Sequence, residues 1–351
     1  MQTTLKSEAV SEAAAVAPEV SIVVAIYNEE ESIPALCEQL DQVMRGLGRP
    51  YEIILVDDGS ADRSWETLLE MGERHAHLKL IRFRRNFGQT PALAAGFDAA
   101  AGDVVVTLDA DLQNDPADIP MMLEHIERGV DVVSGWRKHR QDRYLDRKLP
   151  SMIANWIISR ITGVRLHDYG CSLKAYRRDI VKNIRLYGEM HRFIPALASW
   201  VGGRIDEVPV RHHPRRFGKS KYGISRTLRV VLDLLTVKFL LQYSTRPIQI
   251  FGRIGLRCGA VAALMLLMVA ADGAMGLLGA YDQGGMLAQW PHTYLHKRPF
   301  WIITPLVLFG FCLQFVTLGL MAEMQARTYH ESQNKPVYVI RETVVSRKKA
   351  D

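Results

Sequence analysis

The chain has 351 residues, of which 48% are hydrophobic and 23% are charged, and its formal net charge is +6. This composition excludes a disordered chain, which could not bury enough apolar surface to fold. Ordinary glycine and proline contents exclude collagen, and four scattered cysteines exclude a disulfide scaffold and show no metal-ligand spacing. The length predicts two or three domains, with a polar first part and an apolar last part.

The N-terminal segment, residues 1–19, is rich in alanine and glutamate and lacks an apolar core after a basic start. We therefore predict a disordered tail and no signal peptide. The domain that follows is expected to remain in the cytosol, where its thiols stay reduced.

Residues 20–222 contain strand and helix patterns in alternation. Four short apolar runs rich in β-branched residues are predicted as buried strands, and helical patterns separate them; the strands are 20–26, 51–56, 78–83 and 103–108. This order predicts an α/β domain with a mainly parallel sheet, in which ligands bind beyond the carboxyl ends of the strands. Acidic residues follow three of these strands, namely Glu29 and Glu30, Asp57 and Asp58, and Asp109 and Asp111.

Asp109 and Asp111 flank a small residue directly after a buried strand. Two such carboxylates can hold Mg²⁺ or Mn²⁺ and leave other metal positions for substrate phosphates. The metal would take up the charge that develops on a departing diphosphate. An isolated D-x-D is more typical of a solvated turn, but its place between GDVVVTL and LQNDP favours a ligand site.

Asp57 and Asp58 precede a Gly59-Ser60 turn, where the backbone can approach a ligand closely. The alternative for these acids is an Asx-turn that caps the next helix. The sequence contains no G-x-x-x-x-G-K-[ST] phosphate loop and no G-x-G-x-x-G after the first strand, so it supports neither a P-loop ATPase nor a Rossmann dehydrogenase.

A basic block extends from Arg211 to Arg257, with eleven lysines and arginines and one acid, Asp233. Beside apolar segments, such a block is typical of a surface that contacts anionic lipids. Nucleic acid is the alternative partner, but no nucleic-acid-binding motif accompanies the charge, and we predict none. Within the block, residues 223–247 are predicted as amphipathic juxtamembrane helices, with a packed helix of the soluble domain as the alternative.

Two apolar segments, 250–281 and 300–322, are predicted to form a transmembrane hairpin. The run Phe300 to Ala322 has no charge and would span about 35 Å as a helix, enough for a bilayer core of about 30 Å. A buried soluble helix is the alternative. The first span holds one acid, Asp272, which is either an intramembrane group or an interfacial one. Flanking basic residues place both hairpin ends in the cytoplasm, the loop 282–299 outside, and a cytoplasmic tail at 323–351.

Six segments carry a resemblance to a known family. AIYNEEESI, EIILVDDGSADRS, RRNFGQTPALAAG, GDVVVTLDADLQNDP, DYGCSLKAYRR and FGKSKY, in this order, resemble family 2 glycosyltransferases. They are most similar to the polyprenyl-phosphate branch, which includes dolichyl-phosphate mannose synthases, O-antigen glucosyl transferases and undecaprenyl-phosphate 4-deoxy-4-formamido-L-arabinose transferases.

The resemblance implies a GT-A fold and a bacterial inner-membrane, multi-pass enzyme whose catalytic domain is cytoplasmic. It implies a nucleotide-diphospho-sugar donor, expected to be a UDP-sugar, a polyprenyl phosphate acceptor, Mg²⁺ or Mn²⁺, and a homo-oligomer, a tetramer. One sugar would be transferred with inversion at the anomeric carbon.

The resemblance also implies roles for individual residues. The nucleotide and diphosphate would be held by Ala25, Tyr27, Glu29, Asp57, Asp58, Asp109 and Gln113, and the metal by Asp109 and Asp111. Substrate phosphates would contact Arg137 and Arg140, and a juxtamembrane loop with Arg215, Ser220 and Lys221 would close over them. Asp168 matches the acid that serves as base or sugar-orienting residue. Because a lipid phosphate is already largely ionised near neutral pH, Asp168 would position a substrate rather than act as a strong base.

Two other functions fit the sequence less well. A processive polysaccharide synthase would need several membrane helices and a Q-x-x-R-W motif, which the sequence lacks. A non-catalytic membrane adaptor would have no reason to keep acids at three strand ends together with the DYGC segment.

Overall fold

The computed structural model describes residues 17–138, 155–214 without 157 and 161, and 337–346, together with single helical positions between 236 and 328. The chain divides into two compact units, Met1–Val237 with Pro336–Asp351, and Lys238–Lys335. The segments 223–247, 250–281, 282–299 and 300–322 lie outside the described residues, apart from those single positions. Within the part of the chain that is described, no helix has the length and apolar character that a membrane crossing requires.

The first unit begins with alternating strands and helices, as predicted. They are β1 (Val20–Ile26), α1 (Ile33–Leu47), β2 (Tyr51–Asp57), α2 (Ser64–Arg74), β3 (Leu78–Phe83), α3 (Gln89–Ala99) and β4 (Val104–Asp109). Helix α1 illustrates the local signals, because it has a proline in its first turn and ends at Gly48, which has a φ of 66°.

The second half of this unit is less regular. It contains a 3₁₀ turn η1 (Pro116–Asp118), α4 (Ile119–Glu127), β5 (Val132–Trp136), β6 (Lys174–Arg177), α6 (Arg178–Asn183), a 3₁₀ turn η3 (Met190–Phe193), α7 (Ile194–Trp200) and β7 (Ile205–Pro209). A last strand, β8 (Ile340–Val345), comes from the C-terminal end of the chain.

All eight described strands form one sheet in the order β7-β5-β6-β4-β1-β2-β3-β8. Strands β1, β2, β3 and β4 are parallel neighbours, as are β5 and β7, whereas β6 and β8 run antiparallel to their neighbours. The predicted α/β fold with a mainly parallel sheet is therefore confirmed. The strand order reverses between β1 and β4, and ligands bind at such a point in open α/β sheets.

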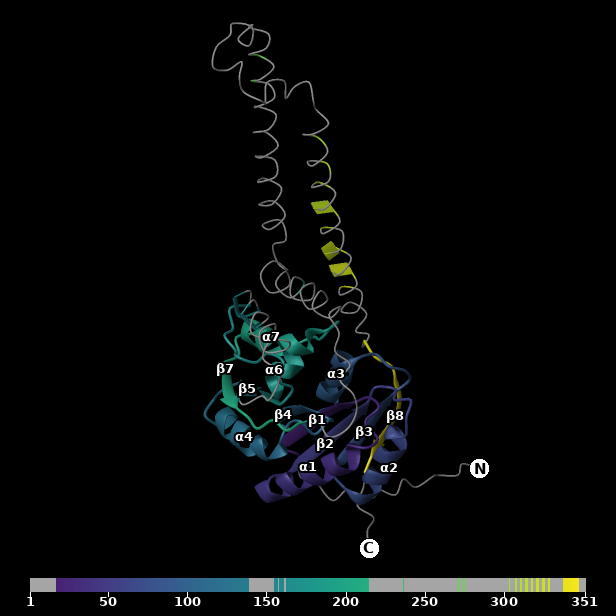
Figure 1. Cartoon of the computed structure of the whole chain (residues 1–351). Coiled ribbons are helices and arrows are strands. Elements are labelled where there is room, and N and C mark those ends of the chain that lie inside the picture. The colour runs from purple at the N-terminus through teal and green to yellow at the C-terminus, as the bar shows by residue number, and fades with distance from the viewer. Residues whose placement is uncertain are drawn as a thin grey trace, which may run out of the picture. The chain divides into compact units, whose positions relative to one another are not determined.

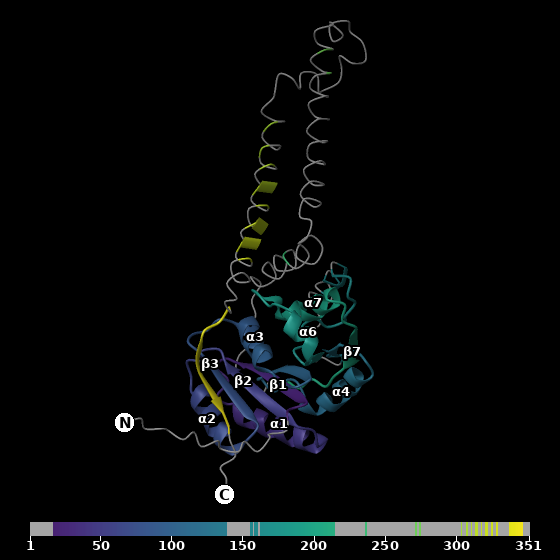
Figure 2. The same ribbon diagram turned by 180° about the vertical axis from the view of Figure 1, so that it is seen from behind.

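Helices cover both faces of the sheet. Helices α1, α2 and α4 lie on one face, and α3, α6 and α7 lie on the other (Figures 1 and 2). The core consists of fully buried aliphatic residues of the central strands together with the inner side of α1. Burial of β1 on both faces explains why its sequence, VSIVVAI, reads as a nearly continuous apolar run.

Strand β8 is a feature that the sequence analysis did not predict, since it assigned residues 323–351 to a tail. The strand pairs antiparallel with β3 at the edge of the sheet. Tyr338, just before it, stacks on Phe83 at a ring distance of 5.1 Å and donates a hydrogen bond to Asp98 at 2.8 Å. The C-terminal segment is thus part of the same folded unit as the N-terminal strands.

Candidate active site

The carboxyl ends of the central strands bring the predicted acids to one edge of the sheet. In the strand register, Asp57 of β2 lies opposite Ile26 of β1, and Asp109 of β4 lies opposite Ala25 of β1. Tyr27 and Glu29 follow β1 directly, and Asp111 and Gln113 follow β4. The structure therefore places these predicted residues at the end of three adjacent strands.

The loops after β1 and β2 are held together by hydrogen bonds. The backbone N–H of Asn28, a residue with a φ of 57°, donates to Ser60 Oγ at 3.0 Å, and the N–H of Ala61 donates to Asn28 Oδ1 at 2.8 Å. The N–H of Glu29 donates to Ser64 Oγ at 2.9 Å. These contacts fix the backbone on which Tyr27 and Glu29 are carried.

Asp57 is fully buried between these loops. Its Oδ1 accepts the backbone N–H of Ser60 at 3.0 Å, while Oδ2 has no hydrogen-bond partner among the described residues and lies 3.5 Å from Arg82 Nε. Burial raises the pKa of the Asp57 carboxyl, and Ser60 and Arg82 oppose this rise. Arg82 Nη1 also lies 3.5 Å from Glu342 Oε1 of β8. The C-terminal strand therefore supplies a second carboxylate to the arginine that faces Asp57.

Asp58 binds the loop after β3. Its carboxylate accepts the backbone N–H groups of Phe87 at 2.7 Å and Gly88 at 2.8 Å, and the Asn86 side-chain amide at 3.0 Å. Gly59 beside it has a φ of 66°, and a Cβ there would lie 2.4 Å from the carbonyl carbon of Arg85. Asp58 therefore anchors the loop that leads into α3, and its contact with a nucleotide stays a prediction.

Asp109 and Asp111 lie in a turn with an unusual backbone. Asp109 Oδ1 accepts a hydrogen bond from Gln89 Nε2 at 2.9 Å, and Asp111 Oδ1 accepts the Gln113 N–H at 3.2 Å. Leu112, which directly follows Asp111, has a φ of 58°, a conformation that a bulky side chain rarely adopts. Such strain is typical of functional turns, because the surrounding structure must hold it in place.

These two carboxylates suit a divalent metal by their donor chemistry. Burial raises the pKa of Asp109, and the nearby charge of Asp111 raises it further, so a bound cation would relieve a real electrostatic cost. Carboxylate oxygens are the hard ligands that Mg²⁺ and Mn²⁺ prefer. Among the described residues no group of three or more His, Cys, Asp or Glu side chains could hold a metal. Substrate phosphates and water would have to complete the coordination.

The segment after this turn is hydrogen-bonded to residues 211–213, which follow β7. The His213 N–H donates to the Gln113 carbonyl at 2.8 Å, and Arg211 makes two hydrogen bonds to Asp118, at 2.7 Å from its N–H and 2.8 Å from Nε. Residue 213 comes shortly before the predicted phosphate loop. Residues 211–213 are thereby tied to the segment that follows Asp109 and Asp111.

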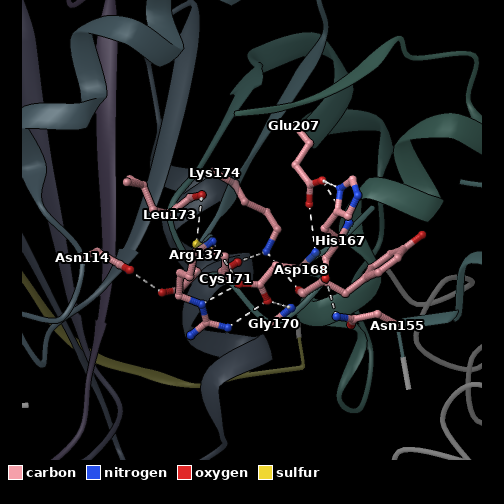
Figure 3. Close-up of polar contacts among 12 residues, drawn as sticks. Asn114, Arg137, Asn155, His167, Asp168, Gly170, Cys171, Leu173, Lys174 and Glu207 are labelled. Atoms are coloured by element: carbon pink, nitrogen blue, oxygen red, sulfur yellow. Dashed lines mark hydrogen bonds and ion pairs between the residues drawn. The ribbon is translucent and has the colours of Figure 1, made fainter. Parts of the chain in front are cut away.

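Arg137 and Asp168 form a buried ion pair. Arg137 Nε lies 2.6 Å from Asp168 Oδ2, and Nη2 lies 2.9 Å from Oδ1, which is a two-point contact (Figure 3). Arg137 follows β5, and Asp168 precedes β6. Since β6 runs antiparallel to β4, its beginning lies at the carboxyl end of β4, beside Asp109.

The pair has a clear protonation state. Burial alone raises the pKa of Asp168, but the hydrogen bonds and the charge of Arg137 outweigh it and hold that pKa below its usual value. The pKa of Arg137 is raised by the same contacts, against the effect of burial. At neutral pH Asp168 is an ionised partner of a guanidinium, which makes it a poor proton acceptor and a good orienting group.

Comparison with known proteins places the chain in a family. Residues 21–185 match the family described as glycosyl transferase family 2. A dodecaprenyl-phosphate galacturonate synthase of Rhizobium johnstonii is 45% identical over 331 residues, which cover 92% of this chain and 92% of that protein. The chain belongs to glycosyl transferase family 2. An undecaprenyl-phosphate 4-deoxy-4-formamido-L-arabinose transferase of Pectobacterium carotovorum is 41% identical over 328 residues, 93% of each chain.

A solved structure shares the fold of this glycosyltransferase. Glucosyl-3-phosphoglycerate synthase of Mycobacterium tuberculosis, in complex with Mn²⁺, UDP and glucosyl-3-phosphoglycerate, aligns with a TM-score of 0.51 at 16% identity, over 64% of this chain and 80% of that one. The predicted GT-A type domain is therefore confirmed at the level of the fold.

Sequence analysis missed three residues that shape the glycosyltransferase site. Glu207 of β7 accepts the backbone N–H groups of His167 and Asp168, both at 2.9 Å, and so holds the segment that carries Asp168. Lys174 of β6, whose pKa is lowered by burial, donates to the carbonyls of Tyr169 and Cys171, and Gln89 binds Asp109. The position of Lys174 inside the apolar run CSLKAY could have predicted a buried lysine. No local sequence pattern indicated the role of Glu207.

The remaining predicted site residues, Arg140, Arg215, Ser220 and Lys221, lie outside the described residues. Their roles stay predictions.

The role of Asp58 in anchoring the loop after β3 can be tested by mutation. Replacing Asp58 by Ala leaves two backbone N–H groups without their acceptor, and hydrogen bonds to a charged group contribute roughly 1.5–3 kcal/mol each. We expect the Tm of the full-length protein in detergent to fall by about 5 °C or more. The matched control, Asp179→Ala, removes a carboxylate that is 67% exposed and should leave Tm within about 1 °C. Equal Tm values for both variants would contradict the anchoring role.

Proposed function

We propose that this glycosyltransferase moves one sugar from a nucleotide-diphospho-sugar to a polyprenyl phosphate at the cytoplasmic face of a bacterial membrane, with inversion. The observation that carries the proposal is that Asp109, Asp111 and the Arg137–Asp168 pair all lie at the carboxyl end of β4. Paired carboxylates suit a metal-bridged diphosphate, and an oriented guanidinium suits a phosphate oxygen. The names of the similar proteins, which specify dodecaprenyl and undecaprenyl phosphate, support the acceptor class.

Each group has a proposed part in the reaction. Ala25, Tyr27, Glu29 and Asp57 lie where a nucleotide would rest against the ends of β1 and β2. Asp109 and Asp111 would hold Mg²⁺ or Mn²⁺, which stabilises the charge of the departing diphosphate. Arg137 would contact a phosphate oxygen, and Asp168 would keep the guanidinium in the orientation that this contact needs. No proton has to be removed from an ionised lipid phosphate, so the low pKa of Asp168 fits this role.

The names of the similar proteins suggest two sugars. One protein is named for galacturonate and the other for 4-deoxy-4-formamido-L-arabinose, and we propose a UDP-linked sugar of one of these two kinds as donor.

The deciding experiment is a transfer assay with the purified full-length protein in detergent. Radiolabelled UDP-galacturonate, UDP-4-deoxy-4-formamido-L-arabinose and UDP-glucose would each be incubated with undecaprenyl phosphate and Mg²⁺ or Mn²⁺. A lipid-linked monosaccharide from one donor supports the proposal. A polymer would indicate a polysaccharide synthase, and no product with any donor would favour an adaptor.

The membrane hairpin of segments 250–281 and 300–322 is part of this proposal, because a tethered acceptor phosphate must meet a donor held in the cytoplasm. Single cysteines placed between Gly284 and Leu295 should react with a membrane-impermeant maleimide in intact spheroplasts. A cysteine at Asp179, in the catalytic domain, should react only after lysis. Labelling of the 284–295 positions only after lysis would refute the hairpin.

A further inference from the structure

The turn η3 carries a charged group whose hydrogen bonding is incomplete. Arg192 Nη2 is buried and has no hydrogen-bond partner in the described part of the chain. The nearest carboxylate oxygen that pairs with it, Glu189 Oε2, lies 3.9 Å away, which is too long for a hydrogen bond. Buried donors in native proteins nearly always have an acceptor, and no described residue supplies one to this atom.

Contacts of α3 link the residue beside Arg192 to Asp109. Gln89 and Thr90 are consecutive residues of the first turn of α3. Gln89 binds Asp109 at 2.9 Å, and Thr90 Oγ1 lies 2.8 Å from Nδ1 of His191, the neighbour of Arg192. The charge of Lys174 opposes the rise in the pKa of Asp109 and contributes to the fall in the pKa of His191, so both groups lie near this lysine. Arg192 therefore belongs to the same end of the sheet as the candidate diphosphate site.

His191 itself adds no charge to this neighbourhood. Burial, followed by the charges of Arg192 and Lys174, lowers its pKa to about 3, so the imidazole is neutral near pH 7. Glu189, the acid nearest to Arg192, is half exposed to solvent. Among the described residues, Nη2 of the guanidinium is thus paired with this half-exposed carboxylate only at 3.9 Å, and an anionic oxygen is the acceptor that matches it best.

We propose that Arg192 binds a phosphate oxygen of one of the two substrates, either the acceptor monophosphate or the donor diphosphate. The proposal rests on the proposed function for the presence of both groups. A guanidinium offers parallel N–H donors that fit a phosphate, and it keeps its charge at any working pH. A second fixed cation, in addition to Arg137, would offset the repulsion between the two anionic substrates, which must approach each other.

Direct binding measurements test this assignment without turnover. The full-length protein in detergent would be titrated with UDP and with uridine, and separately with farnesyl phosphate and with farnesol. Arg192→Gln should weaken one phosphate-bearing probe roughly 10- to 100-fold and leave its phosphate-free partner unchanged. Arg192→Lys, which keeps the charge, should lose less. The control Arg177→Gln removes an arginine at the opposite edge of the sheet, where it lies opposite Val104, and should change no affinity.

The outcomes distinguish the donor diphosphate from the acceptor monophosphate. Weaker UDP binding with normal uridine binding assigns Arg192 to the donor, and weaker farnesyl phosphate binding with normal farnesol binding assigns it to the acceptor. Wild-type affinities for all four probes in Arg192→Gln overturn the proposal. Should Arg192→Gln fail to fold, as judged by its thermal transition, the same ratios in Arg192→Lys decide, and an unchanged ratio again overturns it. Because the wild-type transfer assay is independent of these titrations, failure of the proposed function would be seen separately.

Discussion

Asp168→Asn is expected to lower kcat by roughly 10²- to 10³-fold, the usual effect of misplacing a group that stabilises developing charge. The substitution keeps the size of the side chain but removes the charge that holds Arg137 at 2.6 and 2.9 Å. Arg137→Gln should cause a loss of similar size. Since the two residues act as one unit, the double variant should be little worse than either single variant. Steady-state kinetics of all three variants with saturating donor measure this.

The Arg137–Asp168 pair should also contribute to the thermal stability of the protein. Leaving one member of a buried ion pair without its partner costs about 3–5 kcal/mol. The folded-state pKa of Asp168 lies below its unfolded value, so the stabilisation is present above the ordinary carboxyl range and is lost as the pH falls through the folded value. The difference in Tm between wild type and Asp168→Asn should therefore shrink when the pH is lowered from 7 to 3.

Two results would contradict this account. If Asp168 were a general base, kcat would fall as the pH drops and a carboxyl of raised pKa becomes protonated, and Arg137→Gln would leave that pH dependence intact. Fully additive losses would likewise show that the residues act separately. The control Asp103→Asn removes an acid that is 77% exposed and pairs with Arg178 far from the carboxyl edge, and it should retain wild-type kinetics.

Asp111→Asn is expected to reduce transfer roughly a hundredfold or more, because the turn would lose one of two charged oxygen donors for the metal. EDTA in excess should abolish transfer by the wild-type protein. The loss should also appear without turnover, as weaker binding of Mn²⁺ in the presence of UDP, measured by electron paramagnetic resonance. Full activity in excess EDTA would remove the metal from the mechanism.

A carboxylate from the same loop is a suitable control for this experiment. Asp115 accepts the Ala117 N–H at 2.9 Å and lies 3.2 Å from Arg211, so its contacts are made within the protein. Asp115→Asn should leave the affinity for Mn²⁺ unchanged. An equal loss of Mn²⁺ binding in both variants would mean that the loop as a whole, and not Asp111, supports the metal.

Local sequence patterns determined the strands and the acids at their ends. The β-branched runs that became β1 to β4 alternate with helical patterns, and each run ends within one residue of the predicted end. Because parallel strands finish at one edge, the positions of Asp57, Asp109 and Asp111 at that edge followed from strand order alone. The resemblance to family 2 glycosyltransferases rested on motifs in the same region, and the comparisons confirmed it.

Only the tertiary structure decided which of these residues contact one another. Arg137 and Asp168 are separated by 31 positions, and their contact depends on the antiparallel placement of β6 between β4 and β5. Glu342 lies beside Arg82, 260 positions earlier, because β8 returns to the edge of the sheet. His191, the neighbour of Arg192, likewise contacts Thr90 of α3, which is 101 positions earlier. The hydrophobic periodicity of a helix or strand predicts which of its faces is buried. Contacts between residues far apart in the sequence depend on how the whole sheet packs.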